Sequence, residues 1–272
     1  MQITFWGVRG TCPRWAPSVS RFGGATSCVE CTVGQERLVF DMGTGLFDFA
    51  CNFKQMGSSS CRFFVSHFHI DHIQGWPFFM PAYCPDYRFD LYAAELEEGS
   101  LKQALQGLMQ PPYFPVTMDM MHSQLTFHRI AGDSSFEISS GIKIRTLHLD
   151  HPGGSIGYRL DAGAASCCYI TDHEHRDDAM RTRLTQFIHD CDLLIYDSTY
   201  DDDEFSCYCG WGHSTWQEAV RLGLEAGAKR VAIFHHAPDR TDEQLTAIDA
   251  RARIMHPGAF VARQGQIVQL GE

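Results

Sequence analysis

The sequence predicts an α/β fold built as a sandwich, with two mixed sheets packed together and helices on their outer faces. Strand-like runs separated by short turns occupy the first 70 residues, and strand–helix units follow them, which is the order expected of such layers. A chain of 272 residues that is 44% hydrophobic can bury one large core. We expect a single domain over residues 1–272, with an irregular insertion at about 77–140 near the site.

The expected strands share one feature, which is that an apolar run ends at a polar residue able to take part in chemistry. Residues 1–6 and 26–33 supply two strands near the start of the chain. The six runs that end in this way are Leu38–Phe40 before Asp41, Arg62–Ser66 before His67, Ile142–Leu149 near His151, Cys167–Thr171 before Asp172, Leu193–Tyr196 before Asp197, and Arg230–Phe234 before His235. Six such ends indicate a site assembled at one sheet edge, or at the common edge of two sheets.

Four helices are expected, and they lie mostly after the strands, over residues 95–108, 177–188, 216–226 and 242–254. The third has clear end signals, because Thr215 and Glu218 fit a capping box and Gly227 fits a helix stop. The centre of the 77–140 segment, residues 110–115, is rich in proline and aromatic side chains. That composition disfavours both a helix and a central strand there.

The segment His67–His72 carries four metal-binding side chains within six residues, directly after an apolar strand. In an extended chain His67, His69 and Asp71 project to one face, and a turn brings His72 beside them. Imidazole and carboxylate ligands without thiolates suit a catalytic site for zinc, manganese or iron. One ion cannot easily take four ligands from so short a stretch, so two divalent metal ions are expected.

The charge balance argues against a surface that holds nucleic-acid phosphates, because 33 acidic residues outnumber 22 basic ones and the formal net charge is −11. No stretch approaches the roughly 20 apolar residues of a membrane helix, and the first residues resemble a strand rather than a leader. We therefore expect no membrane contact and a cytoplasmic location. Eleven cysteines without framework spacing indicate reduced thiols. Whether Cys28, Cys31, Cys207 and Cys209 bind a further metal ion is left open.

The cluster at residues 67–72 resembles the His-x-His-x-Asp-His motif of the metallo-β-lactamase superfamily, whose fold is an αβ/βα sandwich with a two-metal site at one edge. The likeness covers most of the chain. Segments similar to motifs of the phosphodiesterase branch, which includes ribonuclease Z, follow in family order: His151–Arg159, Tyr169–Asp172, Ile195–Tyr200, Gly212–Thr215 and Val231–His235.

The resemblance implies a role for each matched residue. The first ion would be held by His67, His69 and His151, the second by Asp71, His72 and His235, and Asp172 would bridge them. Two such ions, roughly 3.5–4 Å apart, lower the pKa of a shared water toward about 7 and favour an in-line displacement at phosphorus. Asp71 would orient the metal-bridging hydroxide or accept its proton, and His213 would stabilise the transition state or protonate the leaving oxygen.

Several assignments stay open on the sequence. His148 is a rival to His151, and His236 is a rival to His235. His173 and His175 either orient metal ligands or belong to a solvated helix start. Asp41 is expected to support the site from below rather than to bind metal. The residues that are candidates to meet a substrate phosphate are Arg9, Arg21 and Arg240.

The function favoured by these observations is a metal-dependent phosphodiesterase acting on a small cyclic nucleotide or cyclic sugar phosphate. Nucleic acid is disfavoured as a substrate, because no basic arm of the ribonuclease Z kind is visible in residues 77–140. The alternatives are ribonuclease Z-like RNA processing, thioester or lactone hydrolysis, and a non-catalytic metal-dependent sensing module. A homodimer is one option for the assembly, and zinc, manganese and iron all suit the ligands.

Overall fold

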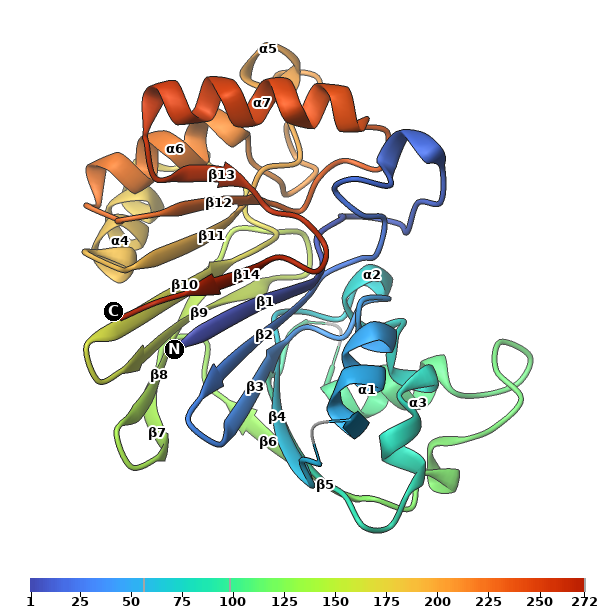
Figure 1. The fold of residues 1–272 in the computed structure, drawn as a ribbon. Coiled ribbons are helices and arrows are strands. Elements are labelled where there is room, and N and C mark those ends of the chain that lie inside the picture. The colour runs from blue at the N-terminus through green and yellow to red at the C-terminus, as the bar shows by residue number, and fades with distance from the viewer. Residues whose placement is uncertain (56, 98, 272) are drawn as a thin grey trace.

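Two seven-stranded sheets lie face to face in the computed structural model, which describes residues 1–55, 57–97 and 99–271 (Figure 1). The first sheet consists, in spatial order, of β14 (Ile267–Gln269), β1 (Gln2–Gly7), β2 (Cys28–Val33), β3 (Glu36–Phe40), β4 (Ser60–Val65), β5 (Arg88–Ala94) and β6 (Gln124–Ile130). Strands β14 to β3 pair antiparallel and β3 to β6 pair parallel. The sheet is therefore mixed, as expected.

The second sheet repeats this division into an antiparallel part and a parallel part. In spatial order it consists of β13 (Ala259–Val261), β12 (Val231–Phe234), β11 (Leu193–Asp197), β10 (Ala165–Ile170), β9 (Ser155–Ala162), β8 (Ile142–Leu149) and β7 (Ser135–Ser139). Strands β7 to β10 form an antiparallel meander, and β10 to β13 are parallel. The parallel pairs require crossover connections, and the helices supply them.

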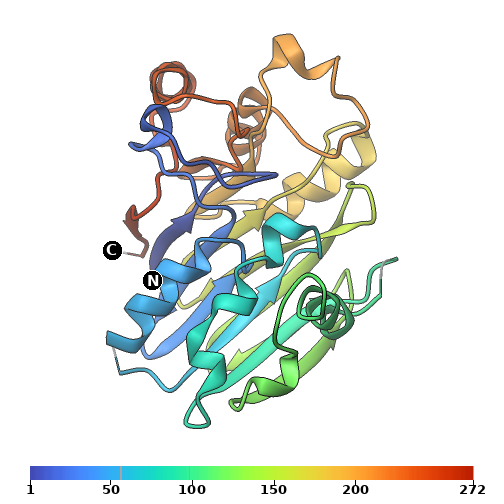
Figure 2. The ribbon, with the colours of Figure 1, turned by 90° about the vertical axis from the view of Figure 1, so that its right-hand side faces the viewer.

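The longer helices cover the outer faces of the two sheets (Figures 1 and 2). Helices α1 (Leu46–Gln55) and α3 (Leu101–Leu108) lie beside the first sheet. Helices α4 (Asp178–Ile188), α6 (Trp216–Glu225) and α7 (Asp242–Met255) pack on the second. The short elements are α2 (Ile70–Ile73), α5 (Asp202–Phe205) and the 3₁₀ turns η1 (Pro17–Val19), η2 (Trp76–Phe78), η3 (Met80–Tyr83) and η4 (Met118–Met120). The predicted sandwich is confirmed.

The segment 77–140 is more regular than the sequence suggested, so the expectation of an irregular insertion is wrong for most of it. It supplies β5 and β6 to the first sheet and β7 to the second. The helix expected from residue 95 begins only at Leu101, because Ser100 caps it by accepting a hydrogen bond from the Gln103 amide. The strands were missed because β6 is half-exposed and lacks a continuous apolar face.

The described part of the chain contains no helix that is both long and apolar enough to cross a membrane.

Aromatic rings join the inner faces of the two sheets. Phe40 at the end of β3 stacks on Tyr169 of the second sheet at a centroid distance of 5.3 Å, and it lies 5.7 Å from Tyr158. Tyr158 in turn donates a hydrogen bond to the Val65 carbonyl of β4 at 2.7 Å. These contacts lie directly beneath the strand ends that carry the candidate site, so packing there fixes the relative position of the two sheets.

Truncation of Phe40 is expected to destabilise the protein strongly. Phe40→Ala leaves a cavity between the sheets, and such changes cost about 3–5 kcal/mol of unfolding free energy. Denaturant unfolding followed by circular dichroism measures the loss. Phe47→Ala is the matched control, because that ring is 57% exposed and its removal should change stability by no more than about 0.5 kcal/mol. Equal losses in the two variants would contradict the role given to Phe40.

Candidate metal centre

The site is assembled where strands from both sheets end. Three residues at these ends have left-handed backbone conformations: Asp41 after β3 (φ 60°), Asp172 after β10 (φ 52°) and His235 after β12 (φ 59°). Such conformations cost on the order of 1–3 kcal/mol each in residues other than glycine, and they are concentrated at functional sites. Here the turn of the chain leaves all three side chains buried among the other polar residues of the same edge.

One donor set is formed by His67, His69, His151 and Asp172, whose ligand atoms all lie within 4.8 Å of one another. His151 Nε2 lies 3.1 Å from His69 Nδ1. Asp172 Oδ2 lies 3.6 Å from His67 Nε2 and 3.7 Å from His151 Nε2. Ligand atoms that bind one zinc at about 2.0–2.2 Å in a tetrahedron are about 3.3–3.6 Å apart. The four side chains therefore fit a single ion.

A second donor set lies on the other side of Asp172 and consists of Asp71, His72 and His235. His72 Nε2 is 3.2 Å from Asp71 Oδ2 and 3.3 Å from His235 Nε2. Asp172 Oδ1 is 3.1 Å from His72 Nε2 and 3.3 Å from His235 Nε2. One carboxylate oxygen of Asp172 thus faces each set, which is the arrangement of a bridging ligand.

Hydrogen bonds hold the rings of His67, His72 and His151 so that Nε2 faces the centre. His72 Nδ1–H donates to Asp41 Oδ2 at 2.7 Å, and His151 Nδ1–H donates to the Gly212 carbonyl at 2.8 Å. His67 Nδ1 lies 3.0 Å from Ser66 Oγ, which itself donates to Asp41. With Nδ1 as donor, Nε2 keeps its lone pair for a metal ion. The buried Nε2 of His67 has no hydrogen-bond partner within the protein, as expected of a ligand atom.

The carboxylates favour positive charge at this centre. Burial lowers the pKa of His72, but the neighbouring Asp172, Asp71 and Asp41 outweigh it and hold that pKa well above its ordinary value. Burial raises the pKa of Asp172, but the surrounding histidines outweigh it, so the carboxylate stays ionised. A divalent metal ion that replaces the His72 proton would be attracted by the same carboxylates. The donor chemistry therefore fits a metal centre.

Asp197 is a site residue to which the sequence assigned no role, although it ends β11 in the same way as the other strand-end residues. His213 Nδ1–H donates to Asp197 Oδ2 at 2.8 Å. Burial lowers the pKa of His213, but the Asp197 carboxylate outweighs this effect and raises the pKa to about 9. The His213 ring lies 5.0 Å from that of His235 and 5.4 Å from that of His151. His213 is therefore next to both donor sets.

The open choices between neighbouring histidines now have structural answers. His235 faces the second donor set, whereas His236 turns away and donates to the Ala262 carbonyl at 2.9 Å. His151 belongs to the first set, whereas His148 points outward and is exposed. Asp41 supports His72 and joins neither donor set, as expected.

The arginines proposed to meet a substrate phosphate have other partners. Arg9 is fully buried and donates to the backbone carbonyls of Gly23, Ala237 and Arg240, so the expectation for Arg9 is wrong. Arg21 donates to Thr246, and Arg240 forms an ion pair with Glu204. Arg9 thus holds the N-terminal loop against the chain that follows His235.

That N-terminal loop passes directly over the second donor set. The Thr11 amide donates to Asp71 Oδ2 at 2.8 Å. A Cβ on Gly10 would lie 2.3 Å from the His235 ring, so only glycine allows the approach.

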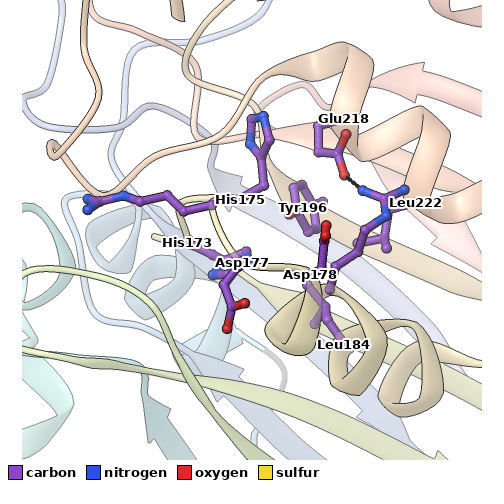
Figure 3. A pocket seen from close by; sticks show the side chains of 10 residues that line it. His173, His175, Asp177, Asp178, Leu184, Tyr196, Glu218 and Leu222 are labelled. Carbon is purple, nitrogen blue, oxygen red and sulfur yellow. Dashed lines mark hydrogen bonds and ion pairs between the residues drawn. The ribbon is translucent and has the colours of Figure 1, made fainter. Parts of the chain in front are cut away.

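His173 and His175 stabilise the backbone around the site and make no hydrogen bond to a donor-set side chain. His173 Nδ1 accepts from the Asp150 amide at 3.3 Å, and its carbonyl accepts from Ser214 Oγ at 2.6 Å. His175 Nδ1 lies 3.0 Å from the same hydroxyl. Both rings line a cavity of about 130 Å³ beside the first turn of α4 (Figure 3).

The four cysteines of the open metal question do not gather into one site. Cys28 and Cys31 are buried in β2, whereas Cys207 and Cys209 are exposed in the loop after α5. Among the described residues, the clusters of three or more candidate ligands contain only histidine and aspartate.

A protein-family model described as a beta-lactamase superfamily domain matches residues 63–236, which is more than half of the chain. The chain therefore belongs to the metallo-β-lactamase superfamily, and it is a metal-dependent hydrolase of that superfamily. Among its curated relatives is a protein of Haloarcula marismortui named Ribonuclease Z, 24% identical over 95% of this chain and 95% of the relative.

Solved structures show the same fold. The metallo-β-lactamase fold protein YhfI from Bacillus subtilis aligns with a TM-score of 0.72 and 21% identity, over 99% of this chain and 98% of that one. A diphosphatase of the PhnP family aligns with a TM-score of 0.71 and 19% identity, over the same shares of the two chains. At these identities the likeness concerns the architecture alone.

Removal of one donor should lower the metal content of the purified protein. His69→Ala is expected to reduce it from about two zinc ions per chain to about one, because the first set loses a ligand and the second stays complete. Inductively coupled plasma mass spectrometry after gel filtration gives the stoichiometry. His148→Ala, the same substitution at an exposed neighbour of the site, should retain both ions. Equal metal content in all three proteins would contradict the assignment of His69.

Proposed function

We propose that this protein hydrolyses phosphodiester bonds at a centre of two divalent metal ions held by the two donor sets. The observation that carries the proposal is His213, which is hydrogen-bonded to the buried Asp197 and lies beside both donor sets. The metal ligands alone would serve the hydrolysis of other esters as well. A separate protonated imidazole is suited to donate a proton to the alkoxide that leaves when a phosphodiester is cleaved.

The number of ions is supported by charge. Four buried carboxylates give the centre an excess of negative charge even with His213 protonated, and this excess favours more than one divalent cation. These carboxylates are Asp41, Asp71, Asp172 and Asp197. When bound, such ions lower the pKa of a coordinated water and stabilise charge on a phosphoryl oxygen. Zinc is the first choice for the imidazole-rich first set, and manganese or iron also suit the ligands.

The protein's own side chains supply positioning and proton transfer. Asp71 is held by the Thr11 amide, so one carboxylate oxygen has a fixed orientation toward the second donor set. His213 keeps its Nδ1 on Asp197, which leaves Nε2–H to donate a proton to the leaving oxygen. The Asp197 carboxylate raises the pKa of His213 to about 9, which favours the protonated imidazole that a general acid needs.

Two observations support a small substrate, such as a cyclic nucleotide or cyclic sugar phosphate. A groove of about 440 Å³ beside His151 is lined by the carboxylates of Glu95, Glu97, Asp150 and Asp177, and none of its lining residues is lysine or arginine. The alignment with the Haloarcula relative extends over 310 positions, whereas this chain has 272 residues. At least 38 residues of the relative therefore have no counterpart in this chain. The groove would repel a long polyanion.

RNA processing is the second candidate, and the relatives favour it. Curated relatives that cover nearly the whole chain are named Ribonuclease Z, which argues against excluding nucleic acid as a substrate. Cleavage of RNA uses the same phosphodiester chemistry, so the two candidates differ in substrate size and not in the catalytic residues.

Substitution of His213 tests the proposed chemistry. His213→Ala should lower kcat for a 2′,3′-cyclic nucleotide, whose leaving group is an alkoxide, about 10²–10⁴-fold, since the variant lacks the general acid. The metal content should stay that of the wild type, because both donor sets are intact. His189→Ala is the matched control, because that imidazole is exposed on the protein surface and should leave kcat unchanged. Full activity in His213→Ala, or no turnover in a wild type with two ions per chain, would refute the phosphodiesterase proposal.

The salt dependence of turnover separates the two substrates. A small phosphodiester carries one negative charge, so we expect kcat/KM to fall less than about tenfold between 50 and 200 mM salt. A precursor-tRNA transcript bound through 6–10 phosphates would instead lose about 10³–10⁵ in affinity over this range. Measurement of kcat/KM for both substrates at the two salt concentrations distinguishes the small-substrate candidate from the RNA candidate. Efficient, steeply salt-dependent cleavage of the transcript alone would establish the RNA candidate.

A further inference from the structure

Glu174 is a buried carboxylate close to the centre that belongs to neither donor set. It follows the bridging Asp172 by two residues, and its side chain is fully buried. A buried carboxylate requires hydrogen-bond donors or a counter-charge to offset the loss of hydration. The nature of those donors indicates what Glu174 does.

Backbone amides of the loop before α6 are the main partners of Glu174. The Gly212 amide donates to Oε2 at 2.7 Å, and the Gly210 amide lies 2.9 Å from Oε1. Arg176, which is half-exposed, covers the carboxylate from the solvent side and donates to Oε2 at 2.8 Å. The two glycines have left-handed backbone conformations, with φ 94° and 84°, which glycine adopts without strain and which turn their amides toward Glu174.

The same loop positions two groups of the centre. The Gly212 carbonyl accepts the hydrogen bond of His151 Nδ1–H, and the next residue is His213. A Cβ on Gly212 would lie 2.2 Å from His151 Nδ1, so the loop lies directly against this ring. The backbone amide of Glu174 also donates to the Asp150 carbonyl at 2.9 Å, one residue before His151. Glu174 thus fixes both sides of His151 and the residue before His213.

We infer that Glu174 is the positioning residue that orients His151 toward the first metal ion and sets the place of His213, acting through the 210–213 loop. The inference rests on the proposed function for the part that concerns His213. A carboxylate is needed because both of its oxygens receive donors, whereas the amide of glutamine would turn an N–H group toward a backbone N–H. Outer-shell partners of metal ligands typically contribute 10–100-fold to metal affinity or activity.

The test compares Glu174→Gln with the wild type by zinc competition against a chelator, without substrate. We expect the first-set zinc to bind about 10–100-fold more weakly in Glu174→Gln, with the second zinc unchanged. At saturating zinc, kcat for a 2′,3′-cyclic nucleotide should fall by about tenfold or more while KM changes less. Unchanged zinc affinity would overturn the inference, whatever the activity. Absence of turnover in the wild type would overturn the proposed function and leave the zinc result decisive for Glu174.

Two further variants separate positioning from loss of general stability. Asp192→Asn makes the same carboxylate-to-amide change at a residue that holds the Ser166 backbone amide far from the centre, so it should leave zinc affinity unchanged. Arg176→Met keeps both glycine contacts and should also bind zinc as the wild type does. If it weakens zinc as much as Glu174→Gln, the ion pair and not the loop is responsible, and the inference fails. Should Glu174→Gln not fold, Glu174→Asp, with its shorter reach, should show the same loss of first-set affinity to a smaller extent.

Discussion

Four hydrogen bonds converge on the buried carboxylate of Asp41, and the rest of the centre depends on them. Its oxygens accept from the Ser66 amide and hydroxyl, from His72 Nδ1 and from the Tyr169 hydroxyl. These donors come from the end of β4, from α2 and from β10 of the opposite sheet. A buried charge with fewer donors would be strongly destabilising, so the two sheets must meet at this edge in one relative position. The left-handed backbone of Asp41 follows from the same requirement.

Asp197 orients residues on the other side of the centre through similar hydrogen bonds. Just as Asp41 reaches His67 through the Ser66 hydroxyl, Asp197 reaches His235 through Thr199, whose hydroxyl lies 2.9 Å from Asp197 Oδ1 and 3.0 Å from His235 Nδ1. It also accepts directly from His213. One carboxylate therefore orients a candidate metal ligand and the candidate general acid together. Substitutions of these residues should be strongly non-additive, because each changes the surroundings of the others.

The sequence is most informative where function depends on neighbouring residues and least informative where it depends on residues far apart in the chain. The ligands of residues 67–72 follow one strand, so their spacing alone predicts that they gather. Asp197 and His213 are 16 residues apart and separated by a loop, and no local pattern links them. In the sequence Glu174 resembles a solvated residue at a helix start. Only the structure shows that it accepts hydrogen bonds from the amides of two glycines. The edge strands β6 and β7 were missed for a related reason, since an edge strand needs only a partial apolar face.

The charge of the whole molecule bears on which substrate of the proposed phosphodiesterase can reach the centre. Two bound ions would reverse the sign of the potential only near themselves, because screening at physiological salt limits their effect to about 8 Å. The acidic groove begins beside His151, and beyond the screening distance a substrate meets a chain with formal net charge −11. A substrate whose charge is confined to the scissile group gains from the ions and avoids the groove's repulsion. A polyanion must bring its remaining phosphates over other parts of the surface, because no arginine or lysine is among the described residues that line the groove. Under the proposed function, electrostatics therefore favours a small substrate over RNA, and the relatives named Ribonuclease Z favour the reverse.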